Sequence, residues 1–273
     1  MTPTNQFNNA VNPHLKQKLF VAAKHGDQNT LRTILGEHPE AANWRLGGKS
    51  VLQAAVEKKQ YTSIATLLQA KADANAKSDD GLTSPLVIAA RNDDTHMIVQ
   101  LIHGGAKAYA VGGGDATPLM NAVRHNAAKA IAVLLAHGAS HAANNDEGNP
   151  ALHVATSAGR LKAAAALLAG KADINQRNAE TLTPLMLAAK EKNLKAAKFL
   201  LENGADDTLK SDLRETALDM ARAFAGGDRV FLDGYENLMA ERLRKLTRDF
   251  LPQMAKGAGR DLEAPGRATF RKK

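Results

Sequence analysis

The chain has 273 residues, of which 44% are hydrophobic and 4% aromatic, and it carries a formal net charge of +8 with no cysteine. The lack of cysteine excludes a disulfide framework, thiolate metal sites and cysteine nucleophiles. No apolar run approaches the roughly 18 residues that cross a bilayer, and the polar N-terminus has no signal-peptide core. We therefore expect a cytoplasmic protein without a membrane span.

Residues 1–13 are polar and are expected to form a disordered lead. The first structural unit begins near His14, with an apolar helical face at residues 19–23 and a second at residues 31–35. Pro39 should end this unit, because proline cannot continue a helix. Trp44 should then cover the exposed end of the stack.

A leucine recurs along the chain at a nearly constant interval. The positions are separated by 33 residues, with one interval of 34: Leu19, Leu52, Leu86, Leu119, Leu152, Leu185 and Leu218. A second apolar pair keeps the same period, at residues 67–68, 101–102, 134–135, 167–168 and 200–201. Two anchors at one fixed period predict stacked repeats that bury their apolar faces against each other.

The repeats carry signals for the start of a helix. Ser84, Thr117 and Thr183 each precede a proline, which predicts an N-cap followed by proline at the first helical position. The fifth repeat has Pro150 at the cap position, so its helix should be less well capped.

The repeats also carry signals for the end of a helix. Gly138 and Gly204 are expected in the left-handed conformation that closes a helix. Lys71 and Lys171 occupy the same place, where a residue with a side chain costs about 1–2 kcal/mol.

Turn-forming residues between the helix pairs predict projecting β-turn fingers at 78–81, 145–148 and 177–180. The connection at 111–115, with three consecutive glycines, should be the most flexible. The extra residue of the 34-residue repeat should lie near residues 82–84, again in a finger.

After Leu218 the repeat weakens. Tyr235, Met239, Leu243, Leu246 and Phe250 recur at helical spacing, which predicts an amphipathic helix over 228–251 that caps the stack. Residues 252–273 contain six basic and two acidic residues, half of the net charge, and are expected to be a disordered basic tail.

These residues resemble the ankyrin repeat family, whose unit is a turn and two antiparallel helices with a T-P-L-H-x-A core. The motif reads Thr117-Pro118-Leu119, Ala151-Leu152-His153-Val154-Ala155 and Thr183-Pro184-Leu185. The resemblance covers residues 14–225. It implies an all-α solenoid of about six full repeats and a partial seventh, and a scaffold or adaptor that binds proteins rather than a catalyst.

In ankyrin-like folds the residues after the Ala-Ala pair of each inner helix face the concave groove. The partner-binding candidates are therefore ten residues of the groove and four of the fingers: Lys24, His25, Glu57, Lys58, Arg91, Asn92, Arg124, His125, Lys190 and Glu191, with Asp79, Asp80, Asp146 and Glu147. Of the six repeats compared, five have a lysine or arginine in this pair of groove residues. This basic charge would attract a partner with an acidic surface. The alternative is an ordinary solvated helix face.

Other motifs carry little chemistry. His137 and His141 straddle a helix end, so we expect no metal site, and His153 should bond the backbone of a neighbouring finger. Gly112–Gly114 lacks the Gly-Lys-Ser/Thr of a phosphate-binding loop. With no catalytic constellation present, we expect neither enzymatic activity nor a cofactor.

Three alternatives remain open alongside a monomeric scaffold. One is a translocated effector that docks on a host protein with the same groove. Another is a binder of nucleic acid or an anionic surface led by the tail, although Phe270 alone is too few aromatics for base stacking. The last is an enzyme with a cryptic site, which would require activity that is lost on single substitutions of groove residues without loss of the fold.

Overall fold

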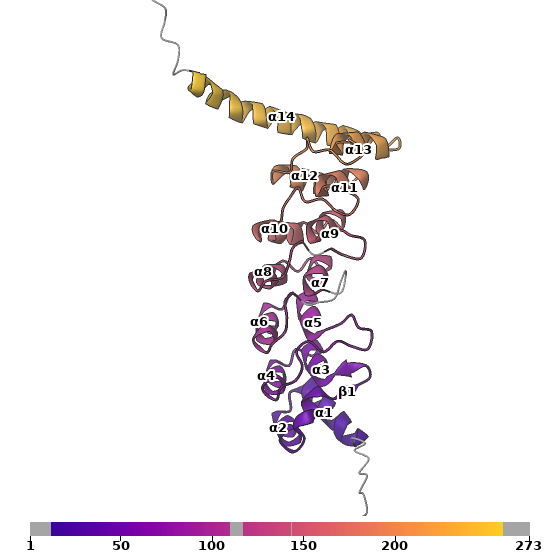
Figure 1. Ribbon diagram of the computed structural model, residues 1–273, viewed down its shortest axis with the longest axis vertical. Helices are drawn as coiled ribbons and strands as arrows, with labels where there is room; N and C mark the ends of the chain where they lie inside the picture. Colours follow the sequence, from indigo (N-terminus) through magenta and orange to yellow (C-terminus); the bar gives the residue numbers. More distant parts are fainter. Residues whose placement is uncertain (1–11, 110–116, 143, 259–273) are drawn as a thin grey trace, which may run out of the picture.

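The structure, a computed structural model, describes residues 12–109, 117–142 and 144–258. Its helices form two columns that run the length of the molecule (Figure 1). The inner column contains α1 (Pro13–His25), α3 (Val51–Glu57), α5 (Pro85–Arg91), α7 (Pro118–Arg124), α9 (Ala151–Ser157), α11 (Pro184–Lys190) and α13 (Ala217–Phe224). The outer column contains α2 (Gln28–Glu37), α4 (Tyr61–Gln69), α6 (Thr95–His103), α8 (Ala128–Ala136), α10 (Leu161–Ala169) and α12 (Leu194–Glu202). The expected all-α solenoid is confirmed.

The core runs as a strip between the two columns. Of the seven recurring leucines, Leu218 is partly buried and the other six are at most 3% exposed. The first leucine of each outer pair, such as Leu67 or Leu134, is fully buried. Each helix pair thus covers the apolar side of its neighbours, as the period predicts.

The first connection contains the short strands of the fold. The 3₁₀ helix η1 (Pro39–Asn43) follows α2, and Trp44 after it is 8% exposed within the core. Strands β1 (Arg45–Leu46) and β2 (Lys49–Ser50) then pair antiparallel around Gly47 and Gly48. Both glycines have positive φ, 57° and 77°, as a two-residue type I′ hairpin requires.

Helix starts follow the sequence signals. The hydroxyls of Ser84, Thr117 and Thr183 each accept a hydrogen bond from the backbone N–H of the third residue of the helix they precede. Pro150 makes no side-chain cap, as expected. The side chain of Asn12 caps the N–H of His14, and α1 begins at Pro13, one residue before the expected start of the first unit. Residues 1–11 of the expected lead lie outside the described residues.

Left-handed backbone recurs in every repeat. The expected φ values are confirmed: 88° at Gly138, 93° at Gly204, 64° at Lys71 and 66° at Lys171. A second series, absent from the sequence expectations, lies between the two helices of a repeat and includes Asp93 (53°) and Asn126 (55°).

Two residues of that second series cap a helix of the next repeat. The outer helices α8 and α10 have no side-chain cap of their own. Instead, Oδ1 of Asp93 accepts from the N–H of Ala130 at 2.7 Å, and Oδ1 of Asn126 accepts from the N–H of Ala163 at 2.9 Å. The left-handed conformation therefore aims each side chain across the boundary between repeats.

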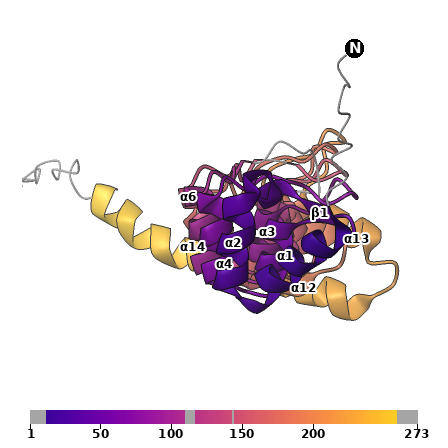
Figure 2. The same ribbon diagram turned by 90° about the horizontal axis from the view of Figure 1, so that it is seen from below.

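The C-terminal helix α14 (Arg229–Ala258) covers the end of the stack and then projects past it (Figures 1 and 2). Phe231 and Tyr235 are buried against the last repeats, at 5% and 0% exposure. Leu243 and Leu246, expected on the capping face, are 66% and 44% exposed. Capping thus involves the first half of the helix, and the side chain of Phe250 lies outside the described residues.

The helix is also longer than the sequence suggested, since it continues through Pro252 to Ala258. A proline inside a helix removes one backbone hydrogen bond and can kink the helix instead of ending it. The rest of the expected tail, residues 259–273, lies outside the described residues.

Arg242 joins α14 to the last helix pair. Its guanidinium donates to the carbonyl oxygens of Leu201 and Ala205, both at 2.7 Å, at the C-terminal end of α12. An ion pair of 3.1 Å to Asp207 completes the contact. A cation placed at the terminal carbonyls of a helix stabilises its C-terminal end.

Candidate binding surface

The β-turn fingers project from the inner column as expected. N–H to C=O bonds close the turns from Ser78 to Gly81 at 2.8 Å and from Asn145 to Gly148 at 3.0 Å. The third turn is Asn178–Thr181, one residue later than expected, and a further turn joins Ser211 to Arg214. The finger expected at 111–115 lies outside the described residues. We call the surface formed by the fingers and inner helices the finger face.

The extra residue of the second repeat is Leu82, in the expected place. The N–H of Ser78 bonds the carbonyl oxygen of Thr83, whereas the other fingers close one residue sooner, as from Asn145 to Asn149. Leu82 therefore bulges from the finger and is 60% exposed.

Asp80 holds this bulge in place. Its carboxylate accepts from the N–H of Leu82 at 2.7 Å, from the hydroxyl of Ser78 at 2.9 Å and from the N–H of Thr83 at 3.1 Å. These bonds lower the pKa of Asp80 below its ordinary value. Asp80 therefore has a structural role in the finger, and a direct role in binding stays a prediction.

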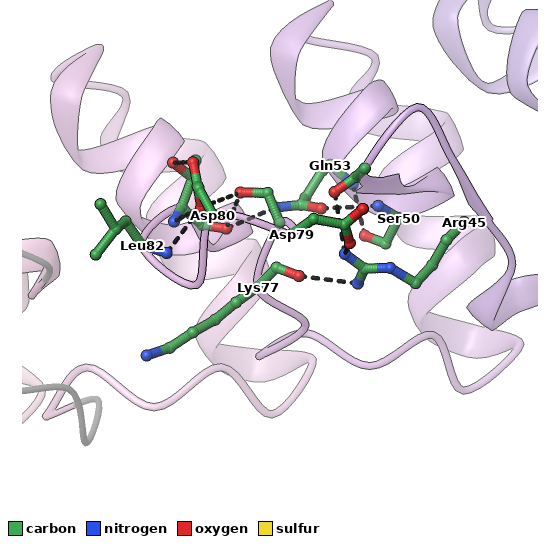
Figure 3. A network of polar contacts seen from close by, with 10 residues as sticks. Arg45, Ser50, Gln53, Lys77, Asp79, Asp80 and Leu82 are labelled. Atoms are coloured by element: carbon green, nitrogen blue, oxygen red, sulfur yellow. Dashed lines mark hydrogen bonds and ion pairs between the residues drawn. The ribbon is translucent and has the colours of Figure 1, made fainter.

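The hairpin of β1 and β2 is the first finger of the array, and Arg45 joins it to the second finger at residues 78–81 (Figure 3). Its guanidinium pairs with the carboxylate of Asp79 and donates to the carbonyl oxygens of Lys77 at 2.8 Å and Gly48 at 3.0 Å. The N–H of Asp79 also bonds the carbonyl oxygen of Gly48 at 2.9 Å. The predicted finger residue Asp79 is thus already engaged within the fold.

The predicted groove residues lie at the C-terminal ends of successive inner helices. Four of them are the last residues of their helices: His25, Arg91, Arg124 and Lys190. Four others occupy the C-cap positions: Lys58, Asn92, His125 and Glu191. Because these helices stack in one column, equivalent positions form a row along the finger face.

The charge of this row is partly compensated. Glu57 pairs with Lys49 at 2.6 Å, and Lys190 pairs with Glu180 at 2.7 Å. Arg91 is exposed and makes no hydrogen bond or ion pair with the described residues, while Lys24 is partly buried. Within this row, Arg91 is therefore the cation most available to an acidic group of a partner.

One pocket brings four of the predicted residues together. It has a volume of about 400 Å³ between the first two fingers, and Glu57, Asp80, Arg91 and Asn92 lie in its lining. Sequence reasoning missed Lys49, which belongs to the same lining. Asp146 and Glu147 lie apart from this pocket, exposed at the tip of a later finger.

A second pocket, of about 280 Å³, lies between the last two fingers and the helices α11 and α13. Of the predicted residues it contains Lys190; its other members, such as Leu213, Glu215 and Phe224, were missed. The available signal was a leucine within the turn sequence Ser-Asp-Leu-Arg of residues 211–214.

His153 makes the backbone bond that its motif position predicts. Nε2 lies 2.9 Å from the carbonyl oxygen of Leu182 in the next finger. Gln53, at the equivalent position of the second repeat, donates to the carbonyl oxygen of Thr83 at 2.7 Å. A side-chain bond from the inner helix to the following finger thus forms in both of these repeats.

Searches for other kinds of site return nothing within the described ranges. No group of three His, Cys, Asp or Glu side chains there could hold a metal ion. None of the helices described is both long and apolar enough to span a bilayer.

Comparison with known proteins agrees with this geometry. The family model "Ankyrin repeats (3 copies)" matches residues 86–178 and 140–211. A curated relative, Dauer abnormal formation protein 25 of Caenorhabditis elegans, is 32% identical over 98 residues, which cover 36% of this chain and 25% of that protein. The matched segment is thus a quarter of that relative's length.

Solved structures extend the likeness over most of the chain. The human ASB11 ankyrin repeat domain is 22% identical with a TM-score of 0.64, and 81% of this chain aligns with 96% of that domain. The ankyrin repeat domain of Bcl-3, a member of the IkappaB protein family, is 20% identical with a TM-score of 0.68, and 80% of this chain aligns with 97% of that domain. Residues 86–211 match ankyrin repeats in sequence, and the two solved domains show the ankyrin repeat fold over about four fifths of the chain.

Proposed function

We propose that this chain is a non-enzymatic scaffold, or adaptor, that binds a protein partner through its finger face. The observation that supports this most directly is that the finger face carries two pockets whose walls are fixed before any partner arrives. Arg45 bridges the fingers beside the first pocket, and Arg177 bridges those beside the second by donating to the carbonyl oxygens of Thr181 and Lys210. A surface held in this way loses little conformational entropy on association.

An acidic group on the partner is part of the same proposal. Arg91 offers an exposed guanidinium at the first pocket that is not neutralised by the described residues. Arginine is favoured at interfaces because its planar group binds a carboxylate with two hydrogen bonds. A cytoplasmic location and a monomeric scaffold complete the proposal.

The test is affinity capture with charge-reversed proteins. The finger-face variant is Arg91→Glu/Arg124→Glu. The control is Lys129→Glu/Lys162→Glu, which places the same charge change at exposed positions on the outer helices α8 and α10. Proteins captured by the wild type and by the control, but lost with the finger-face variant, support the proposal.

The opposite pattern would redirect the search. If every captured protein survives the finger-face reversal and is lost with the control, the binding surface is the outer column. Circular dichroism and the melting temperature of each variant check that the fold is intact.

A further inference from the structure

The pocket between the last two fingers differs in chemistry from the rest of the finger face. Its floor includes Leu182 and Met220, 5% and 3% exposed, and its walls include Leu213 and Phe224, 81% and 44% exposed. Single exposed apolar residues are common on protein surfaces. Here two of them line one hollow above buried apolar side chains, and a polar rim around such a patch marks an interaction site.

The rim of this pocket is acidic. Its lining contains Glu180, Asp212 and Glu215 and one base, Lys190. Lys190 is paired with Glu180 at 2.7 Å, whereas the carboxylates of Asp212 and Glu215 have no partner among the described residues. Two unpaired negative charges therefore flank an apolar hollow. The first pocket has the opposite charge to offer, since its unpaired group is the guanidinium of Arg91.

Several backbone N–H groups of the finger beside the pocket already have hydrogen-bond acceptors. The N–H of Ser211 bonds the carbonyl oxygen of Glu215 at 2.9 Å, the N–H of Arg214 bonds that of Ser211 at 2.9 Å, and the N–H of Asp212 bonds the hydroxyl of Thr181 at 3.3 Å. A partner would therefore be recognised here through side chains and not by adding a strand.

We propose that this pocket holds one large apolar side chain of a partner peptide segment, flanked in that segment by lysine or arginine. The proposal rests on the proposed function and assigns the chemistry of one subsite. The volume of about 280 Å³ is just below the roughly 300–1,000 Å³ of small-molecule pockets, which suits an amino-acid side chain. The flanking cations pair with Asp212 and Glu215, so the partner would carry a basic segment here and an acidic group near Arg91.

The test is selection from a displayed library of random twelve-residue peptides on the immobilised full-length protein. Selection is repeated on Asp212→Lys/Glu215→Lys, on Arg91→Glu, and on the matched control Glu37→Lys/Glu202→Lys. The control makes the same charge change at exposed positions of the outer helices α2 and α12, away from the finger face. Peptides with an apolar residue between basic residues should be enriched at least tenfold by the wild type and the control. Their enrichment should fall below twofold on Asp212→Lys/Glu215→Lys.

The outcomes separate this inference from the proposed function. Equal enrichment on Asp212→Lys/Glu215→Lys overturns the pocket assignment. Enrichment of acidic peptides that depends on Arg91 alone also overturns it, while leaving the finger face as the binding surface. A selection in which no enriched peptide responds to any of the finger-face changes overturns both.

Discussion

Replacing His153 with glutamine should remove a pH-dependent loss of stability. His153 is fully buried, and the carbonyl oxygen of Leu182 can only accept, so Nε2 must carry the proton. Nδ1 is then an acceptor, and it has no partner. A second proton on Nδ1 would have nothing to bind, and burial accordingly lowers the pKa of His153 from 6.5 to about 4, with the bond to Leu182 opposing the shift.

The sign follows from which state binds more protons. Below pH 6.5 the unfolded chain takes up a proton on this imidazole that the folded chain refuses until about pH 4. Stability is therefore complete above pH 6.5 and is lost as the pH falls toward 4. A pKa difference of about 2.5 corresponds to roughly 3 kcal/mol in full, of which about 2 kcal/mol should be lost between pH 7 and pH 4.5.

Glutamine is the informative replacement because the chain already uses it at the equivalent position. Gln53 makes the same bond to the following finger and does not titrate. Urea unfolding, followed by circular dichroism at several pH values between 8 and 4.5, should give curves for wild type and His153→Gln that diverge as the pH falls. The carboxylates with lowered pKa, such as Asp27 and Asp219, lose their contribution only below pH 3.8, outside this window.

The reasoning would be refuted if the two curves ran parallel. In that case the free energies of unfolding of the two proteins would differ by an amount that is constant to within about 0.5 kcal/mol over this pH range. They would show that the imidazole of His153 is protonated in the folded state, which requires that Nδ1 find an acceptor. Comparing two proteins cancels the titration of the other histidines, which both retain.

Four further changes test the fold. Lys171→Gly should raise the melting temperature by roughly 2–4 °C, since removing about 1–2 kcal/mol of left-handed strain outweighs the added freedom of glycine in the unfolded chain; an unchanged value in calorimetry would contradict this. Pro150→Thr should stabilise by about 1 kcal/mol in urea unfolding, because it supplies a hydroxyl cap and an N–H for Nδ1 of His153. Asn126→Gly keeps the left-handed backbone but removes the cap on α10, and should cost about 1 kcal/mol. Arg242→Met should cost about 2–3 kcal/mol by removing its hydrogen bonds to Leu201 and Ala205 and its ion pair with Asp207, whereas the exposed control Arg244→Met should cost under about 0.5 kcal/mol.

The 33-residue period predicts most of the array because each repeat solves the same packing problem. A leucine at a fixed place implies a buried face, and Thr-Pro implies a helix start, so residues such as Leu119 and Thr117 could be placed without coordinates. The position of the extra residue near residues 82–84 was also predicted correctly. An insertion is tolerated in a finger because Leu82 can bulge there without moving the core.

The errors arise where the local signal is absent. The turns ending at Gly81 and Gly148 were placed correctly because glycine marks the left-handed residue, but Thr181 takes that conformation at φ 64° in the third turn. Pro252 suggested a helix end that the backbone does not make. The extent of α14 against the stack depends on contacts with α12 and α13 that no local pattern encodes.

The binding surface was harder to predict than the fold. Listing the inner-helix ends identified Arg91 and Glu57, which do share a pocket, but the sequence could not show that Lys49 neutralises Glu57 or that Asp79 is held by Arg45. These partners lie on separate elements, so the remaining free charge is a property of the folded surface.

Contacts across repeat boundaries connect the stability of the array to its use as a scaffold. Asn126 caps α10 from the preceding repeat, and Asn75 receives the N–H of Lys107 at 2.9 Å while donating to the carbonyl oxygen of Gly105 at 2.9 Å. Because such bonds form only when adjacent repeats are both folded, they add to the coupling between neighbours on which a linear array depends. The same coupling fixes the spacing of the fingers. It follows that a change such as Asn126→Gly, at a residue that lines neither pocket, should weaken peptide binding through the larger entropy lost on association, with the contacts themselves unchanged.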